Sequence, residues 1–430
     1  MKNVLEVDQS GLCLECGTCE GVCPHKNVKL IPDESGRNRV HILDDSHCAK
    51  CPGICLKACP GHEIDMDQLN LQVFGKLPEN YWAGNYKQAF LGYSPDDVIQ
   101  KTSASGGIVS TLLIHALETG MIQGVYLLTP QSGKPFELTA ALATDAEAVL
   151  AAAGSVYWPA PIGQCLREIL HSDGKYAFVG LPCEIQALRK AQKVYQQLND
   201  KIAFAIGIYC GGRTTIAGQR FAFSRYGIEL DEVAEIKYRQ PEWPGHLKVT
   251  LKDGGEVHVY KSQQLQGFSG QIFGAPRCIY CNDAIADLSD ISTGDAIRLE
   301  GFRNPEEKSI LVARTKVGLE LLEAAHRANK LVLREVPIEK LVHSQHRPIL
   351  HKKLALWARL KVAKKLFGKA VPKITMTAPD GAIKLKPVFF TAGARIILMG
   401  NLTSKPFFRK LLKIVPMRWL KKYSNFEIYS

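Results

Sequence analysis

The sequence contains no apolar run long enough to cross a lipid bilayer. A spanning helix needs about 20 predominantly apolar residues, and the longest apolar stretches, IVSTLLIHAL and FAIGIYC, are much shorter. The N-terminus, MKNVLEVDQSG, also lacks the charged and then apolar segments of a secretory signal. We therefore expect a cytoplasmic protein, in which cysteines are metal ligands or redox groups more often than structural disulfides.

Two common ligand-binding patterns are also missing. No G-x-G-x-x-G follows an expected strand, so a nicotinamide site of the Rossmann type is not indicated. No DNA-reading motif is present, and the net charge of +12 is concentrated at one end of the chain. Residues 351–430 hold 18 Lys and Arg against 2 acids, which leaves the other 350 residues with 36 Lys and Arg against 40 acids. This mildly acidic body argues against nucleic acid as a partner.

Cysteine, in contrast, is abundant: the chain has 13, and eight of them form two runs in the first 60 residues. The first run, CLECGTCEGVCP, has the spacing of bacterial ferredoxins. The second, CAKCPGICLKACP, has one extra residue between its second and third cysteines. In this pattern three thiolates of a run reach one cubane, while the fourth reaches a second cubane. We predict two 4Fe–4S clusters, one held by Cys13, Cys16, Cys19 and Cys59, and the other by Cys48, Cys51, Cys55 and Cys23. A pair of zinc sites is the alternative.

Three regions follow from composition. Residues 1–65 form the two-cluster module, an α+β ferredoxin-like domain, and residues 69–85 have the composition of a linker. Over residues 85–345, short apolar runs such as YAFVGL alternate with helical segments such as PCEIQALRKAQKVYQQL. This alternation predicts an α/β domain with a largely parallel sheet. Residues 346–430 are expected to form a basic helical tail.

The other five cysteines lie in the expected α/β domain. Cys183 and Cys210 each follow an apolar run that reads as a strand, so a parallel sheet would place both at its carboxyl edge, where ligands bind. Cys278 and Cys281 add a closely spaced pair on a loop, and the four together could hold a third cluster. The alternative is that Cys183 and Cys210 are small buried hydrophobic residues. Cys165 lies in a helical pattern and is expected to serve packing.

The segment KTSASGGIVSTLLIHAL is a Ser/Gly turn that leads into an apolar helix. Free N–H groups at such a helix start favour phosphate, and glycines allow a ligand to approach the backbone closely. The alternative is that Ser105 only caps the helix. No general acid is assigned, because His115 and Glu184 read equally well as a core histidine and a first-turn acid.

As a set, four motifs resemble the beta subunit of the deazaflavin (coenzyme F420) hydrogenases and dehydrogenases. They are KTSASGG, GLPCEIQALRK, the Cys-Gly-Gly at Cys210 and CIYCNDAIADLSDISTGDA. The resemblance covers roughly residues 85–300 and fades after about residue 345. It implies FAD in the α/β domain and a cluster on Cys183, Cys210, Cys278 and Cys281. It also implies a flavin pocket lined by Lys101, Ser103, Ser105, Gly106 and Gly107, to which Tyr157 and Arg239 are added.

The resemblance implies an iron–sulfur flavoprotein oxidoreductase. A flavin exchanges electron pairs with a deazaflavin or another small-molecule hydride donor or acceptor, and single electrons with clusters. A redox carrier or partner subunit would meet the ferredoxin end. The alternative function is a non-catalytic electron-relay subunit of a larger complex.

The basic tail contains two amphipathic segments. Residues 351–369 place Leu356, Leu360, Ala363 and Phe367 on one helical stripe, and residues 404–422 repeat the mixture, with Pro416 interrupting any helix. Such segments bind anionic membrane surfaces, here the inner face of the membrane. The alternative is that the stripe packs on the protein's own body or on an acidic partner.

Overall fold

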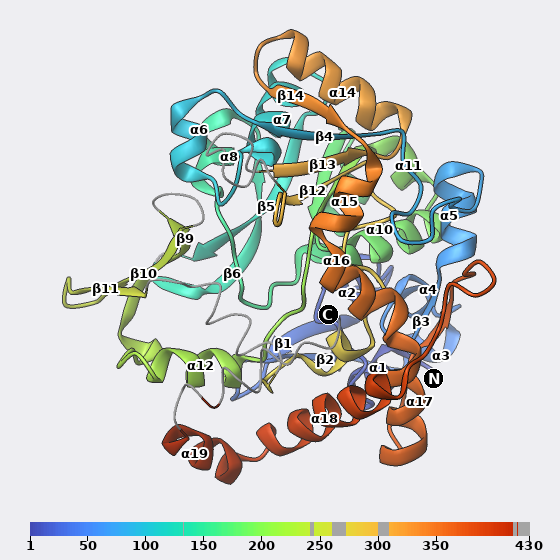
Figure 1. The fold of residues 1–430 in the computed structure, drawn as a ribbon, viewed down its shortest axis with the longest axis vertical. Coiled ribbons are helices and arrows are strands. Elements are labelled where there is room, and N and C mark those ends of the chain that lie inside the picture. The colour runs from blue at the N-terminus through green and yellow to red at the C-terminus, as the bar shows by residue number, and fades with distance from the viewer. Residues whose placement is uncertain (132, 241–244, 260–271, 300–308, 416–418, 420–430) are drawn as a thin grey trace.

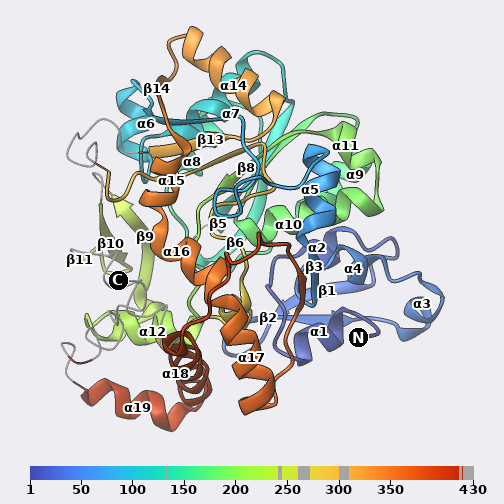
Figure 2. The same ribbon diagram turned by 45° about the vertical axis from the view of Figure 1, so that its right-hand side comes forward.

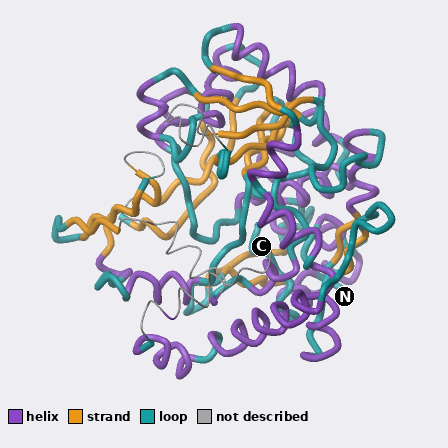
Figure 3. The backbone as a smooth tube through the Cα atoms, in the orientation of Figure 1, coloured by secondary structure: helices purple, strands orange, loops and turns teal. Residues whose placement is uncertain are grey.

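The computed structural model describes residues 1–131, 133–240, 245–259, 272–299, 309–415 and 419. An eight-stranded sheet with the order β14-β4-β13-β12-β8-β7-β5-β6 forms its centre (Figures 1 and 3). The strands are β4 (Gln88–Tyr93), β5 (Gly124–Gln131), β6 (Lys134–Ala143), β7 (Tyr176–Gly180), β8 (Ile202–Ile208), β12 (Ile291–Asp295), β13 (Ser309–Ala313) and β14 (Val332–Val336).

The sheet is mixed, so the prediction of a largely parallel sheet was wrong in part. β8 pairs in parallel with β7 and β12, and β5 pairs in parallel with β7. However, β13 runs antiparallel to both β12 and β4, while β6 and β14 close the two edges as antiparallel strands. Only two residues separate β5 from β6, and a connection that short permits antiparallel pairing alone.

Helices cover both faces of this sheet. On one face α7, α8 and α14 bury residues such as Leu112, Val149 and Leu322 against Phe204 and Leu311 of the strands. On the other face α9 and α10 bury Leu166, Ile185 and Leu188. The helices of this domain are α6 (Asp97–Thr102), α7 (Ile108–Glu118), α8 (Ala146–Ala151), α9 (Leu166–His171), α10 (Pro182–Val194), α11 (Gln197–Lys201), α12 (Ile216–Ser224), α14 (Lys316–Arg327), α15 (Ile338–Ser344) and α16 (His346–Ile349).

A separate three-stranded antiparallel sheet consists of β9 (Val233–Gln240), β10 (His246–Leu251) and β11 (Glu256–Val259). Its inner side chains, including Val233, Leu247 and Val249, form a small core with Phe223 of α12. β9 of this sheet places Arg239 beside Asp295, the last residue of β12 in the central sheet.

The N-terminal module packs on the face of the central sheet that α9 and α10 cover. Its elements are α1 (Val4–Gln9), α2 (Thr18–Gly21), β1 (Val28–Pro32), β2 (Asn38–Ile42), α3 (Asp45–Lys50), α4 (Ile54–Ala58) and β3 (Glu63–Asp65). The contact between α2 and the 3-10 turn Ile162–Cys165 is very close, because Gly163 N donates to Cys16 O at 2.7 Å. A Cβ on Gly21 or Gly163 would overlap the facing chain, so both positions require glycine.

The structure differs from the expected organisation in the stretch that reads as a linker. α5 (Met66–Phe74) begins just before this stretch, runs into it, and buries Met66 and Leu69 against Ile185 and Leu188 of α10. Asp65 caps this helix by accepting from Gln68 N at 3.0 Å. The N-terminal module is therefore joined to the α/β domain by a packed helix.

The C-terminal region also departs from the expected tail, because much of it is part of the body. It contains α17 (Leu356–Phe367), β15 (Lys373–Thr375), α18 (Pro387–Thr403) and α19 (Pro406–Ile414) (Figure 2). β15 pairs in parallel with β3 of the N-terminal module. Ala363 is buried in a cluster with Val7 and Leu12, so the stripe of residues 351–369 packs on the protein itself, which was the alternative.

Pro416 lies outside the described residues. None of the helices within the described ranges is long and apolar enough to cross a membrane.

Candidate functional site

The first cysteine group consists of Cys13, Cys16, Cys19 and Cys59. These residues line one small cavity together with apolar side chains such as Val4, Val7 and Val40. Burial, and after it the neighbouring Cys59, raises the pKa of Cys16 to about 11. Two backbone groups donate to sulfur: Glu15 N to Cys13 Sγ and Gly61 N to Cys59 Sγ, both at 3.3 Å. Such hydrogen bonds to sulfur help to set the reduction potential of an iron–sulfur cluster.

The second cysteine group consists of Cys23, Cys48, Cys51 and Cys55. Asn27 links its two halves, because its backbone N donates to Cys23 Sγ and its Nδ2 to Cys48 Sγ, both at 3.3 Å. Burial and then the neighbouring Cys23 and Cys51 raise the pKa of Cys55 to about 12. None of the residues of α3, which carries Cys48, is buried. This group therefore lies close to the protein surface.

The third cysteine group consists of Cys183, Cys210, Cys278 and Cys281. Cys183 is in the first turn of α10, Cys210 follows β8, and the other two lie in and after the 3-10 turn Pro276–Tyr280. Burial raises the pKa of Cys183, and Cys281, Cys210 and Cys278 are among the neighbours that raise it further. The loops are joined by backbone bonds, including Cys210 N to Ala284 O at 3.0 Å. The strand ends thus bring these four thiols to one edge of the sheet.

Three cations connect the third group with the first: Arg277 is buried, and Lys190 and Arg213 are half-buried. Arg277 donates to the carbonyls of Gly61 (2.7 Å) and Pro60 (3.1 Å), immediately after Cys59. Lys190 of α10 donates to Cys59 O at 2.7 Å, and Arg213 forms an ion pair with Glu15 at 2.8 Å. Cys55 of the second group is, in turn, among the neighbours that, after burial, raise the pKa of Cys19. The three groups therefore follow one another from the sheet edge to the surface near α3.

The loop that contains Ser103, Ser105, Gly106 and Gly107 lies between α6 and α7, after the end of β4. Its glycines serve packing, because a Cβ on Gly106 would lie 2.8 Å from Ser309 Oγ and one on Gly107 would lie 2.6 Å from Ile99 Cγ2. Gly107, at φ 76°, caps α7 in place of Ser105. Ser103 Oγ is buried without a hydrogen-bond partner among the described residues. Lys101 is exposed at the end of α6.

Arg239 lies at the same corner of the sheet as this loop. It forms an ion pair with Asp295 at 3.0 Å, and Asp295 pairs with Ser309 of the next strand. Ser309 Oγ accepts from Gly106 N at 2.9 Å, which joins the two predicted parts of the pocket. Although burial opposes it, Asp295 and then Tyr157 raise the pKa of Arg239, so Tyr157 is also close by.

The donor sets fit the predicted cofactors. A 4Fe–4S cluster takes one thiolate on each of four irons, so its ligands need not converge on a point. Accordingly, within the described ranges no three His, Cys, Asp or Glu side chains are placed to hold a single metal ion. The orphaned Ser103 hydroxyl beside the start of α7 and the Arg239 cation fit a flavin diphosphate. The ligand and flavin assignments stay predictions.

Several residues at the site were not predicted from the sequence. Arg277 precedes Cys278 and Arg213 follows the Cys-Gly-Gly motif, so their positions next to motif cysteines were an available signal. Lys352, which contacts the third group from the C-terminal region, had no such signal among the many basic residues there. Cys165 is buried in an apolar cluster with Ile162 and Leu166, as expected for packing.

The fold and the cysteine groups define a class: an α/β protein joined to a cysteine-rich module. Residues 89–167 match the family model for the N-terminal part of the coenzyme F420 hydrogenase/dehydrogenase beta subunit, and residues 173–339 match the model for its C terminus. The chain belongs to this family, which confirms the resemblance seen in the motifs.

Individual relatives are 26 to 29% identical to this chain over the aligned residues. The coenzyme F420-dependent sulfite reductase of Methanocaldococcus jannaschii is 27% identical over 78% of the chain, which spans only 49% of that protein. The coenzyme F420 hydrogenase subunit beta of Methanothermobacter thermautotrophicus is 29% identical over 60% of the chain and 87% of the relative. Among solved structures, a chain of the F420-reducing [NiFe] hydrogenase complex from Methanosarcina barkeri matches with a TM-score of 0.53 and 26% identity. That match covers 69% of this chain and 98% of the other.

Proposed function

We propose that the protein is an oxidoreductase subunit that transfers electrons between a two-electron donor or acceptor and one-electron carriers, through FAD and three 4Fe–4S clusters. The observation that supports this proposal is the succession of three cysteine groups, with Arg277, Lys190 and Arg213 between the first and the third. The names of the relatives point to coenzyme F420 as the two-electron partner. A bound flavin would supply the exchange between electron pairs and single electrons.

The residues of this chain have separate tasks in the proposed function. Ser103, Arg239 and the first turn of α7 bind the diphosphate of the flavin at the corner of β12 and β13. The third cysteine group holds a cluster at the neighbouring strand ends, where β8 lies beside β12. The first and second groups continue the path outward, and a redox carrier or partner subunit docks near α3, where the second group comes closest to solvent.

The test is anaerobic purification followed by flavin and iron counting, and then reduction trials with coenzyme F420, NADH, NADPH and reduced ferredoxin. The proposal expects FAD, about twelve irons for three cubanes and reduction by at least one soluble two-electron donor. Clusters without flavin would contradict the enzyme and support a relay subunit within a larger complex.

We further propose that α19 rests on an anionic membrane surface. Its inner residues, such as Phe408 and Leu412, pack on the body, while Phe407 and Ile414 are 73% and 79% exposed. Residues 381–426 contain ten Lys and Arg and no acid. Apolar side chains beside lysines suit a lipid surface, with each basic residue near the headgroups adding about 1 kcal/mol.

A further inference from the structure

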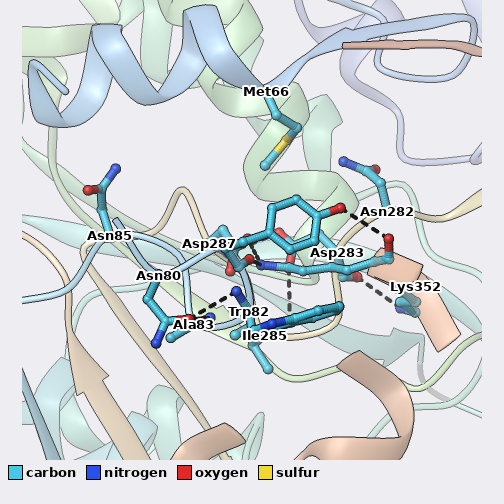
Figure 4. Close-up of polar contacts among 12 residues, drawn as sticks. Met66, Asn80, Trp82, Ala83, Asn85, Asn282, Asp283, Ile285, Asp287 and Lys352 are labelled. Atoms are coloured by element: carbon cyan, nitrogen blue, oxygen red, sulfur yellow. Dashed lines mark hydrogen bonds and ion pairs between the residues drawn. The ribbon is translucent and has the colours of Figure 1, made fainter. Parts of the chain in front are cut away.

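Lys352 is a fully buried lysine that reaches the third cysteine group from the C-terminal region. It lies in a π-helical segment, Leu350–Leu354, and is only 2% exposed. Its Nζ donates to Cys210 O at 2.7 Å and to Asp283 O at 2.9 Å, and Figure 4 shows it beside Asp283 and Asn282. Irregular helical turns of this kind are frequent at functional sites.

The segment around Lys352 holds both loops of the third group. Arg359 Nε donates to Ile279 O at 2.7 Å, between Cys278 and Cys281. Lys353 is anchored beside them by an ion pair with Asp287 and a bond to Tyr81 O at 2.8 Å. These residues lie beyond residue 339, where the family model ends, so the contact is made by a part of the chain outside the shared domain.

The charge of Lys352 lacks the usual compensation. A buried ammonium group requires a counter-charge, because desolvation of an unpaired charge is very costly. Lys353 has the carboxylate of Asp287, but no side-chain carboxylate hydrogen-bonds Lys352 among the residues the structure describes. The carboxylate of Asp283 is occupied by the N–H groups of Ile285 and Asp287, both at 2.9 Å. The nearby groups that favour its charge are the thiols of Cys281, Cys210 and Cys278 and, after them, the carboxylate of Asp283.

We propose that Lys352 is a positioning residue that raises the reduction potential of the cluster on the third cysteine group. The inference rests on the proposed function, since it requires that these four cysteines hold a cluster. A fixed positive charge in a low-dielectric site stabilises the reduced cluster, which carries one more negative charge, relative to the oxidised one. The positive charge of Lys352 thereby makes the third cluster easier to reduce.

The test compares Lys352→Gln with wild type in the full chain, purified anaerobically. Glutamine removes the charge but can still donate a hydrogen bond to the loop carbonyls, so the loops remain held. Midpoint potentials are measured by redox titration followed by electron paramagnetic resonance. We expect the third cluster of Lys352→Gln to become reduced only at a more negative potential, while the two clusters of the N-terminal module keep theirs. Lys352→Arg retains the charge and is expected to keep the wild-type potential.

Lys190→Gln is the matched control, because Lys190 is a comparable lysine that donates to Cys59 O of the first group. This variant should shift the midpoint potential of the cluster on the first group and leave the potential of the third cluster unchanged. The inference is overturned if Lys352→Gln contains the wild-type iron but its third cluster titrates at the wild-type potential. It is also overturned if Lys352→Gln and Lys190→Gln shift the midpoint potentials of all clusters equally. A wild-type protein with only about eight irons would instead overturn the third cluster of the proposed function itself.

Discussion

At the scale of single residues, the site is defined by which thiols lie among other thiols and which lie among apolar side chains. Cys278 and Cys165 illustrate the contrast: Cys278 has Cys183, Cys210 and Cys281 around it, whereas Cys165 is enclosed by aliphatic side chains. Asn27 shows how a side chain can bind two members of one group, Cys23 and Cys48, that are 25 residues apart in the sequence. Spacing in the sequence therefore identifies a group only when both halves are considered.

Replacing Cys278 with Ser is expected to remove roughly four irons, because the third cluster loses one of its four ligands. The iron of the N-terminal module and its ferredoxin-like spectrum should remain. Cys165→Ser is the control, since Cys165 lies outside the three groups, and it should retain all iron. Full iron in Cys278→Ser would show that this cysteine is not a ligand.

Replacing Ser103 with Ala is expected to weaken FAD binding about fivefold, the value of one hydrogen bond of about 1 kcal/mol. The unfolding temperature should not fall, because Ser103 Oγ has no hydrogen-bond partner among the described residues that the change could remove. Equilibrium titration of the flavin-free protein with FAD measures the effect. Thr111→Val is a matched control: Thr111 Oγ1 is also buried and lacks a described partner, but Thr111 lies in the core face of α7. Equal FAD affinity in Ser103→Ala and wild type would remove Ser103 from the pocket.

At the scale of elements, α10 links the third cysteine group with the first. It begins at Cys183 of the third group, and Lys190, two turns later, reaches Cys59 of the first group. Glu184 Oε2 accepts from Leu181 N at 2.7 Å, so the helix start is fixed by a first-turn acid. The contact of α2 with the turn Ile162–Cys165 fixes the module from the other side.

Replacing Gly163 with Val is expected to separate the N-terminal module from the α/β domain. The new side chain would meet Thr18 and Cys16 O, and overpacking of this kind costs about 1–3 kcal/mol of unfolding free energy or more. Thermal unfolding and limited proteolysis within residues 1–65 measure the change. In Gly400→Ala, the nearest atom to the new Cβ is Ile279 Cδ1 at 3.8 Å, so this variant should retain or slightly gain stability. Wild-type stability in Gly163→Val would contradict the close contact.

At the scale of the whole molecule, charge is divided between a slightly acidic body and a basic C-terminal region, yet this region is not uniformly exposed. Lys352, Lys353 and Arg359 are each at most 2% exposed, so part of the positive charge is internal. α18 and α19 run along one side of the molecule (Figure 1), and they carry Arg395, Arg409, Lys410 and Lys413. The two most exposed large apolar side chains of the described residues, Ile414 and Phe407, lie on α19, so we expect a surface interaction of the tail at that helix.

The double variant Phe407→Asp with Ile414→Asp is expected to abolish flotation with anionic liposomes, because it replaces the exposed apolar residues of α19 with charges repelled by the lipid. Wild-type flotation should weaken as salt is added. Leu366→Asp is the control, since Leu366 is 70% exposed on α17, away from α19. If the wild-type protein does not bind anionic liposomes at low salt, the proposal that α19 binds a membrane surface is wrong.

The sequence predicts those parts of the structure that depend on neighbouring residues. Pro182, the first residue of the segment PCEIQALRKAQKVYQQL, is also the first residue of α10. The direction of β13 could not be predicted, because its apolar run SILVA reads the same way in a parallel or an antiparallel sheet. The burial of Lys352 could not be predicted either, since its partners lie 142 and 69 residues away. A lysine beside an apolar stripe ordinarily indicates a solvated face.

The pairing of β3 with β15 has a consequence for how the protein is made. Glu63 and Lys373 bond across 310 residues, so the strand that completes the N-terminal module is synthesised long after the module itself. At 5–20 residues per second, the interval is roughly 15 to 60 s. During that time the cysteine-rich segment has left the ribosome without β15, α17 or Lys352. Any cluster inserted into the module before release would therefore enter an incompletely packed chain, and only a cluster delivered after release would meet the complete packing.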